Sequence, residues 1–520
     1  MVNHHRQVPF RLLRDVPALS CGDPGSGNLI VQGDNLLALK ALLPYYAGQV
    51  KCIYIDPPYN TGNEGWIYND NTNSPVIKKW LGEVVGKEGE TLDRHDRWLC
   101  MMYPRLALLK RFLRKDGAIF VSIDDNEYDL LKMLMGDIFG PENHVGTFIW
   151  KRRTTPDSRN LNGVSGDHEY VLCFQRSPEF RVKGQEKDLG KYTNPDNDPR
   201  GPWMSDNLTG LANAKERPNL HYDIIHPITG ARYKPHPSRG WGYGQERMAE
   251  AIKNDRILWP KRENGRPRLK RFMSDMQSQT TGFSTVLNAP GNVEATKELH
   301  DLLGPKAFAF PKPTRLVEIL ISQATGPNDL VLDSFAGSGT TGHAVLSLNK
   351  QDGGNRKFLI IEMDRGIAES ITAKRIRHAA VGHIDSKGEA VPGIGGEFRF
   401  CELGEPLFED SGRIRPSVTF ADLARHVYFT ETGEPLPKER IGKSPFLGEC
   451  RGVGIYLLYN GILGDKSAAG GNVLTRQVLN ALPPFKGQKI IYCAGNLLGK
   501  ERLDAQRIIV RQTPYEIKVA

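Results

Sequence analysis

The sequence predicts an α/β protein built around a mixed sheet. Three observations predict this fold class. Short apolar runs alternate with stretches of helical periodicity over residues 28–175 and again over residues 301–384. A glycine-rich turn joins one apolar run to the next helix near residue 335. The chain has 520 residues, which is enough for two or three domains and a large buried core.

The elements of the first half follow in order. Residues 1–27 are rich in Gly, Pro and Ser and predict a loose arm. Residues 28–34 predict a strand, 35–43 an amphipathic helix and 50–56 a buried strand. A long helix is expected over residues 98–113, with basic side chains such as Arg105 mostly on its solvated face. Strands are expected over residues 116–124 and at the end of the segment 147–174, just after His168, Glu169 and Tyr170.

The tetrapeptide Asp56-Pro57-Pro58-Tyr59 ends the buried strand and carries the first chemical signal. An exocyclic amine on an aromatic ring becomes nucleophilic when acceptors hold its hydrogens and its lone pair localises. Asp56 can accept one hydrogen, and the Pro57 carbonyl, whose direction the paired prolines fix, can accept the other. Tyr59 offers a flat face for a base rotated out of a duplex. The four residues are therefore candidate catalytic residues for amine methylation, although the tetrapeptide can also simply end a strand and begin a turn.

The second signal is the stretch DLVLDSFAGSGTTGHAV, in which a short strand, a glycine loop and a helix start follow one another. The loop has Gly-x-Gly-x-x-Gly spacing, and Glu362 ends the next strand about 20 residues later, as in a dinucleotide site. S-adenosylmethionine (AdoMet) suits the same sheet edge, with Asp333 near its ammonium and Glu362 near its ribose. The Asp-Pro-Pro-Tyr motif favours AdoMet, because hydride transfer by a NAD-dependent oxidoreductase has no use for it.

Together these motifs resemble the amino-directed DNA methyltransferases of the beta arrangement, in which the catalytic motif precedes the cofactor loop. The flanking stretches IVQGDNLLALKALL, MYPRLALLKRFLRKDGAIFVSIDDNE and FPKPTRLVEILI match as well. The resemblance covers about residues 28–175 and 305–380, and it extends to the modification subunits of type III restriction-modification systems. It implies an AdoMet-dependent, Rossmann-like mixed sheet in circularly permuted order, with an inserted target recognition region and a small C-terminal α/β domain.

The resemblance also implies the reaction and the cofactor contacts. The reaction is methyl transfer from AdoMet to adenine N6 in duplex DNA by base flipping, without a covalent enzyme intermediate. Cytosine N4 is the alternative target, and a NAD-dependent oxidoreductase or a non-catalytic DNA-binding subunit are less favoured functions. The residues expected to bind AdoMet are Asp34, Lys312, Thr314, Asp333, Phe335, Gly337, Gly339, Thr340 and Glu362. Asp34 alternatively serves as a helix N-cap.

The expected domain boundaries follow from the segments that the resemblance covers. Residues 1–27 form the arm, 28–175 the catalytic half, 176–300 the target recognition region, 301–384 the AdoMet-binding half and 385–520 a C-terminal domain. The C-terminal domain is a candidate for dimerisation or for docking of a restriction (helicase-nuclease) subunit. The recognition region contains AIKNDRILWPKRENGRPRLKRF, with eight basic and two acidic residues. The candidate DNA contacts in this stretch are Lys261, Arg262, Arg266, Arg268, Lys270 and Arg271. The alternative is that the stretch is only a solvated basic loop.

The composition agrees with a nucleic-acid partner. The chain carries 69 Lys and Arg against 60 Asp and Glu, a formal net charge of +9, which suits a polyanion. Seven scattered cysteines without a Cys-x-x-Cys pair predict reduced thiols and no metal site. No apolar stretch is long enough to span a bilayer, and the first residues lack the apolar core of a signal peptide. We therefore expect a cytoplasmic protein with no membrane partner.

Overall fold

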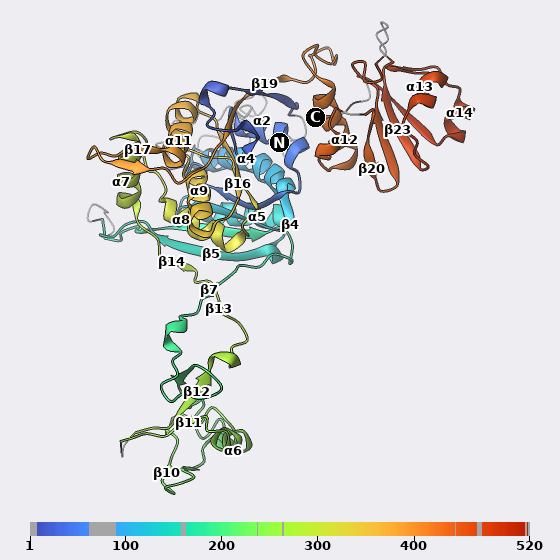
Figure 1. Ribbon diagram of the computed structural model, residues 1–520. Coiled ribbons are helices and arrows are strands. Elements are labelled where there is room, and N and C mark those ends of the chain that lie inside the picture. Colours follow the sequence, from blue (N-terminus) through green and yellow to red (C-terminus); the bar gives the residue numbers. More distant parts are fainter. Residues whose placement is uncertain are drawn as a thin grey trace. The chain divides into compact units, whose positions relative to one another are not determined.

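The computed structural model describes residues 8–61, 90–157, 163–236, 238–262, 265–442, 444–464, 471–514 and 517. The chain divides into two compact units. The larger unit joins Met1–Lys183 with Ser284–Ala520, and the smaller unit is Gly184–Phe283. The larger unit is thus built from two stretches of sequence, with the smaller unit inserted between them (Figure 1).

A ten-stranded mixed sheet forms the core of the larger unit and confirms the predicted fold class. The strands from β19 through β4 run parallel, whereas β6 is antiparallel to both of its neighbours. In spatial order the strands are β1 (Arg11–Asp15), β19 (Arg399–Pro406), β2 (Leu29–Gln32), β16 (Lys357–Glu362), β15 (Leu330–Asp333), β3 (Val50–Ile55), β4 (Leu113–Ile123), β6 (His168–Gln175), β5 (His144–Lys151) and β14 (Val286–Leu287).

The pairing of β3 with β15 positions the candidate site. The two strands are parallel neighbours, with Val331 opposite Cys52 and Leu332 opposite Ile53, although the smaller unit lies between them in the sequence. Because parallel strands end at the same edge of a sheet, Asp56 after β3 and Asp333 at the end of β15 leave the sheet on the same side. This is the arrangement that the circularly permuted motif order predicts.

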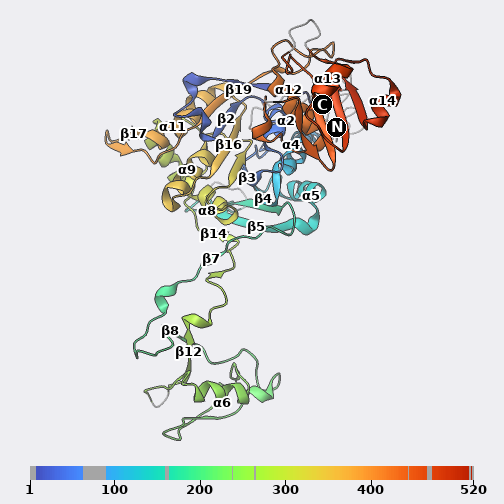
Figure 2. The same ribbon diagram turned by 45° about the vertical axis from the view of Figure 1, so that its right-hand side comes forward.

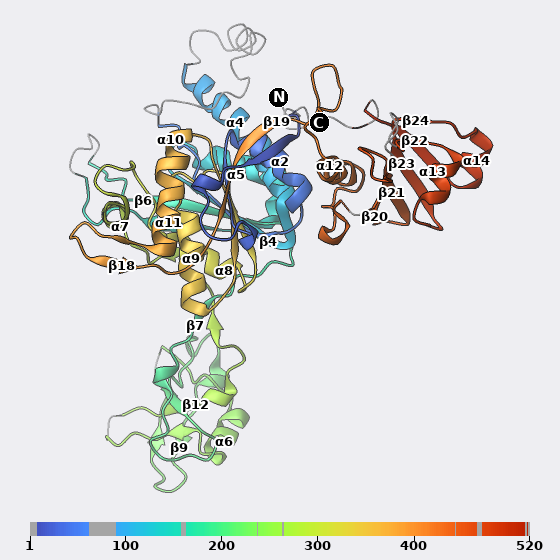
Figure 3. The same cartoon turned by 45° about the horizontal axis from the view of Figure 1, so that its top comes forward.

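Helices cover both faces of the sheet (Figures 1 and 3). One face carries α2 (Asn35–Tyr46), α4 (Glu90–Phe112) and α5 (Tyr128–Phe139), and the other carries α8 (Thr314–Ala324), α9 (Thr340–Asp352) and α11 (Ala373–Val381). Ile53, Leu332 and other strand residues between the layers are fully buried. Among the helices of the described ranges, none is both long and apolar enough to cross a membrane.

The prediction that Arg105 lies on the solvated face of α4 is wrong. Its side chain is completely buried, and it donates hydrogen bonds to the Met101 carbonyl at 2.7 Å and to the side chain of Asn35. A buried guanidinium is tolerated only when such acceptors surround it. Arg105 therefore joins α4 to the start of α2 instead of facing solvent.

The sheet extends into both terminal segments. β19 pairs with β2 in parallel, and β1 pairs with β19 in antiparallel orientation, so part of the predicted loose arm is a strand of the core sheet. Beyond β19, α12 (Phe420–Thr432) contacts α2 and buries Leu423 and Val427 in the same hydrophobic core. A second, four-stranded sheet follows, formed by β20 (Phe446–Cys450), β21 (Val453–Leu457), β23 (Gln488–Cys493) and β25 (Ile508–Gln512).

The smaller unit folds into elements of its own (Figure 2), and its apolar side chains form a small core. Trp241 and Met248 are almost fully buried within it, so the inserted region is more than a solvated loop. A three-stranded antiparallel sheet and one helix, α6 (Gln245–Lys253), organise this core. The strands are β11 (Ile257–Leu258), β12 (Arg268–Phe272) and β8 (Trp203–Asp206).

Candidate active site and basic surface

The motif Asp56-Pro57-Pro58-Tyr59 follows directly after β3 and turns at its end. Trp98 Nε1 donates a hydrogen bond of 2.7 Å to the Pro58 carbonyl, which fixes the second proline peptide. Within the described ranges, no residue donates to the Pro57 carbonyl, so this oxygen has acceptor capacity left. The Asp56 side chain remains 26% exposed, so a substrate group can reach it.

Four side chains from three parts of the chain meet at this motif, and we name them the motif cluster: Asp56, Tyr59, Glu169 and Lys312. The Lys312 ammonium donates to both Asp56 carboxylate oxygens at 2.8 Å and lies 3.4 Å from Glu169 Oε2. The Tyr59 hydroxyl lies 2.8 Å from Asp56 Oδ1 and 3.0 Å from Glu169 Oε2. The sequence singles out Asp56, Tyr59 and Lys312 as site residues. It marks Glu169 only as part of His168–Tyr170, which resembles a motif of the catalytic half in the amino-directed DNA methyltransferases and has a structural role as the alternative.

The charges of the motif cluster set its protonation states. Burial acts to lower the pKa of Lys312, but Asp56 and Glu169 outweigh it and raise this pKa above its usual value. Burial first, and then Asp56 and Glu169, raise the pKa of Tyr59 well above its usual value. Lys312 is therefore a charged ammonium and Tyr59 a neutral hydroxyl, and both act as donors to the carboxylates.

The Lys312 ammonium belongs to the motif cluster, and its predicted contact with AdoMet stays a prediction. This ammonium is engaged by Asp56 and lies 4.8 Å from the centre of the Tyr59 ring. The Lys312 backbone carbonyl accepts a hydrogen bond of 3.2 Å from the hydroxyl of Thr340, where the glycine loop enters α9. The position of the ammonium has an electrostatic reason, because a buried ammonium takes the carboxylates within its reach.

The glycine loop connects β15 to α9 with the backbone that the spacing predicts. Gly337 has φ +50° and Gly339 has φ +81°, in the left-handed region that favours glycine. A Cβ at Gly339 would also approach the Thr372 backbone at 3.2 Å. The Gly337 N–H donates to Glu362 Oε2 at 2.8 Å, so the loop is tied to the end of β16.

Asp333 and Glu362 are carboxyls at the ends of neighbouring parallel strands. Asp333 accepts hydrogen bonds from the Phe335 N–H at 2.9 Å and from the Thr341 hydroxyl at 2.5 Å. Burial raises the pKa of Asp333 to about 7, with further contributions from Asp56 and Glu362. Burial likewise raises the pKa of Glu362 to about 7. In the absence of a ligand, both carboxyls thus titrate near neutral pH.

These features fit AdoMet, which carries an ammonium, a sulfonium and ribose hydroxyls. Within the described residues, the buried Ser334 hydroxyl beside Asp333 has no hydrogen-bond partner. Asp333 would hold the ammonium and Glu362 the ribose hydroxyls, because the two carboxyls end the strands that border the glycine loop. Buried carboxyls with raised pKa values cluster at functional sites, which agrees with a ligand site here.

Asp34 and Thr314, which were also predicted to contact AdoMet, form hydrogen bonds within the protein. The Asp34 carboxylate caps α2 by accepting from the Leu37 N–H at 3.0 Å, so the N-cap interpretation describes its hydrogen bond. Thr314 begins α8, and its hydroxyl accepts from Arg375 at 2.9 Å. Arg375, buried in α11, also donates to the Ser338 and Thr340 hydroxyls at 2.8 Å each. No motif in the sequence marks Arg375, whose hydrogen bonds to Ser338 and Thr340 connect the glycine loop to α11.

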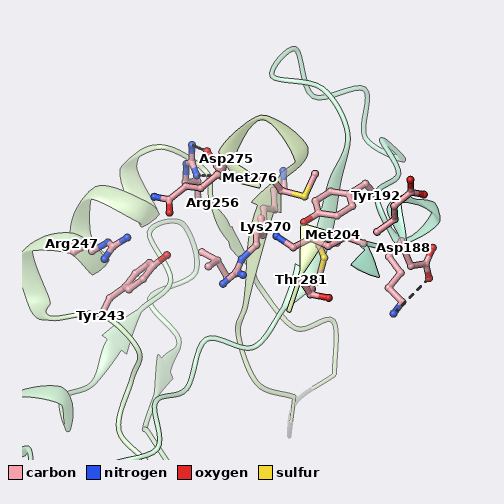
Figure 4. Close-up of a pocket in the computed structure, with 16 residues that line it drawn as sticks. Asp188, Tyr192, Met204, Tyr243, Arg247, Arg256, Lys270, Asp275, Met276 and Thr281 are labelled. Atoms are coloured by element: carbon pink, nitrogen blue, oxygen red, sulfur yellow. Dashed lines mark hydrogen bonds and ion pairs between the residues drawn. The ribbon is translucent and has the colours of Figure 1, made fainter. Parts of the chain in front are cut away.

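The smaller unit contains a cavity of about 770 Å³ (Figure 4). Its walls combine cationic side chains with Tyr192, Tyr243, Met204 and Met276. The guanidinium of Arg247 lies 4.3 Å from the centre of the Tyr243 ring. The cations that line the cavity are Lys187, Lys191, Arg247, Arg256, Lys270 and Arg271.

The six predicted DNA contacts are not equivalent. Lys270 is only 5% exposed, and its ammonium lies 2.7 Å from Asp196 and 3.2 Å from Asp255. It therefore neutralises acidic groups inside the unit, which corrects its predicted role. Arg271 pairs with Asp206 at 2.7 Å, and Arg268 donates to Ser205, while both side chains stay exposed. The remaining three, Lys261, Arg262 and Arg266, are exposed.

Replacing Lys270 with Met should destabilise the smaller unit, because Asp196, Asp198 and Asp255 would lose the cation they share. We expect the unit's thermal transition to fall by roughly 5 °C. Calorimetry of the full chain measures the transition temperature. Limited proteolysis then shows whether early cleavage falls within residues 184–283. Lys261→Met is the matched control and should leave the transition unchanged. Equal transition temperatures for Lys270→Met and Lys261→Met would contradict a structural role for Lys270.

Comparison with known proteins gives consistent matches. A family model described as DNA methylase (N6_N4_Mtase) matches residues 50–374. The Mod subunit of the type III restriction-modification enzyme StyLTI from Salmonella typhimurium is 34% identical, over 69% of this chain and 56% of that protein. The EcoP15I Mod subunit from Escherichia coli is 31% identical, over 65% and 59%. The type II methyltransferase M.KpnI from Klebsiella pneumoniae is 31% identical, over 68% and 84%.

The chain therefore spans little more than half the length of these two Mod subunits. Solved structures that match include the PvuII DNA methyltransferase (cytosine-N4-specific), at 15% identity and a TM-score of 0.34, over 68% of this chain and 89% of that one. The complex of M1.HpyAVI with SAM matches at 15% identity and a TM-score of 0.31, over 67% and 98%.

Proposed function

Because the chain belongs to the N6/N4 DNA methylase family, we propose that it transfers a methyl group from AdoMet to adenine N6 in duplex DNA. One observation carries the proposal. Asp56 and Asp333 stand at the ends of the neighbouring parallel strands β3 and β15. An acceptor for an amine hydrogen thus adjoins a loop that suits a cationic methyl donor.

The chemistry assigned to the chain's own residues is positioning. AdoMet, when bound, supplies an electrophilic methyl group on a sulfonium. Asp56 and the Pro57 carbonyl would each accept one hydrogen of the target amine, so that the nitrogen lone pair localises toward that methyl group. As the new N–C bond formed, the S–C bond of AdoMet would break and leave a neutral thioether, and the methylated nitrogen would release one proton to solvent. Lys312 lies above the Tyr59 ring, 4.8 Å from its centre, and we assign the stacking of an extruded base to this tyrosine.

The choice of adenine rests on Asp at the first motif position and on the likeness to Mod subunits. Cytosine N4 is the second candidate, because the family model covers both amines. By the same likeness, the protein would be the modification component of a restriction-modification system acting on DNA in the bacterial cytoplasm. A second copy of the chain and a restriction subunit are its proposed partners, with residues 385–520 as the docking segment.

We further assign DNA contact to the exposed basic residues of the smaller unit, the proposed target recognition region: Lys261, Arg262, Arg266, Arg268 and Arg271. Arg262→Ala and Arg266→Ala should each weaken DNA binding severalfold and reduce the slope of log K against log salt by about 1, because each arginine releases one condensed counterion. Fluorescence anisotropy at several salt concentrations measures both quantities. Arg413→Ala, an exposed arginine outside this unit, is the control. Unchanged slopes would remove these arginines from the interface.

The function itself is tested by nucleoside mass spectrometry. DNA from a methylation-free bacterial host that expresses the chain should contain N6-methyladenine, and DNA from a host that expresses Asp56→Ala should not. N4-methylcytosine in place of N6-methyladenine would keep the reaction but change the base. A wild-type chain that methylates no DNA in the host, or when purified with AdoMet and duplex DNA, would refute the proposed function.

A further inference from the structure

The acceptor that amine methylation requires is already occupied in this structure. Lys312 donates to both carboxylate oxygens of Asp56 at 2.8 Å, and the Tyr59 hydroxyl lies 2.8 Å from Oδ1. A target amine hydrogen needs one of these oxygens. Oδ1 already accepts from two donors, so an entering base competes with Lys312 and Tyr59 for the carboxylate. Lys312 can withdraw from Asp56 only toward another anion, because a buried ammonium without a partner is strongly destabilising.

Glu169 offers that acceptor. It is the second residue of β6 and is only 5% exposed. Its Oε2 lies 3.0 Å from the Tyr59 hydroxyl and 3.4 Å from Lys312 Nζ, the donors that occupy Asp56. Its Oε1 lies 3.5 Å from Arg152, which keeps a positive charge nearby. Glu169 therefore faces Asp56 across the same ammonium and the same hydroxyl.

We propose that Glu169 is a positioning residue that receives Lys312 and Tyr59 when the target base enters, and thereby frees Asp56 to accept the amine hydrogen. This inference rests on the proposed function. Lys312 is already within salt-bridge distance of both carboxylates, so the exchange needs only a small displacement of the ammonium. The ammonium moves from one carboxylate to another, and so it is never left unpaired.

The charge of Glu169 is what the exchange requires. A glutamine at this position keeps the size of the side chain and an acceptor for Tyr59, but it offers Lys312 no anion. Lys312 would then stay on Asp56, and the state in which Asp56 is free would become rarer. A shorter side chain that keeps the charge should preserve more activity than one that keeps the shape. A purely structural role for Glu169 predicts the opposite order.

The test compares Glu169→Gln, Glu169→Asp and the control Asp125→Asn in single-turnover methylation of duplex DNA at saturating AdoMet. Asp125 is a matched control, since it accepts a 2.9 Å hydrogen bond from the adjacent Tyr170 hydroxyl but is not part of the motif cluster. We expect Glu169→Gln to reduce the rate about 30-fold, Glu169→Asp to reduce it less, and Asp125→Asn to keep it within twofold. Calorimetry should show AdoMet binding within twofold of wild type for all three.

A second arm isolates Lys312. In a Lys312→Met background no ammonium has to leave Asp56, so adding Glu169→Gln should reduce the rate less than twofold further. The inference is overturned if Glu169→Gln is as active as Glu169→Asp, or if Glu169→Gln causes the same fold loss in both backgrounds. A wild-type chain without methylation activity would instead refute the proposed function, so the two failures are distinguishable.

Discussion

Asp56→Ala is expected to lower the methylation rate by about a thousandfold or more while AdoMet still binds. The loss follows because the variant has no side-chain oxygen to hold the target amine. The fold should survive, because the Lys312 ammonium keeps Glu169 3.4 Å away as its counterion. Single-turnover assays with radiolabelled AdoMet and calorimetric titration of AdoMet measure the two effects separately.

Asp329→Ala is the matched control for Asp56→Ala. Asp329 precedes the other end of β15 and pairs with Arg114 at 2.8 Å, so its removal deletes a carboxylate from the same sheet but far from the motif. It should leave methylation nearly unchanged. If Asp56→Ala loses AdoMet binding together with activity, Asp56 has a structural role and the catalytic assignment fails.

The parts of the site that depend on regular strands were predictable from the sequence. β3 and β15 are short apolar runs that end in polar motifs, as expected for parallel strands buried on both faces. The positive φ angles at Gly337 and Gly339 also follow from the spacing of the glycines. Local sequence suffices for such features, because the burial pattern and the turn are properties of the segment itself.

The burial and the ion-pair partners of charged side chains were not predictable from the sequence, because the partners come from distant segments. Lys270 lies in a strongly basic stretch, yet its ammonium is held by Asp196 and Asp255. Arg105 looks like a solvated helix residue, but Asn35 and Met101 accept its hydrogen bonds inside the core. The contacts of Glu169 also depend on distant segments, because it reaches the motif cluster through the pairing of β6 with β4, the neighbour of β3.

AdoMet binding is expected to strengthen as the pH rises through about 7, because the pKa of Asp333 and that of Glu362 are both raised to about 7. Below this pH both carboxyls carry a proton in the free protein, and a cationic ligand must displace it from Asp333. The dissociation constant should therefore be about tenfold higher at pH 6 than at pH 7.5. Titrations stop at pH 7.5, since the α-amino group of a ligand loses its own proton near pH 8.

Calorimetry in two buffers of different ionisation enthalpy should detect proton release on binding below pH 7. Asp333→Asn should bind AdoMet more weakly and show a smaller pH dependence. If wild-type affinity is the same at pH 6 and pH 7.5, Asp333 does not hold the ammonium.

The same carboxyl makes an opposite prediction for the stability of the ligand-free protein. The pKa of Asp333 in the folded state lies well above the usual value of an aspartate, so the folded state binds this proton more tightly than the unfolded state does. Stability contributed by this group is present at low pH and is lost as the pH rises from about 4 to about 7. At pH 8 ligand-free Asp333→Asn should therefore melt several degrees above wild type, and this gain should shrink as the pH falls toward 5. If the variant binds AdoMet poorly yet melts at a higher temperature, the Asp333 carboxylate favours AdoMet binding and destabilises the ligand-free protein.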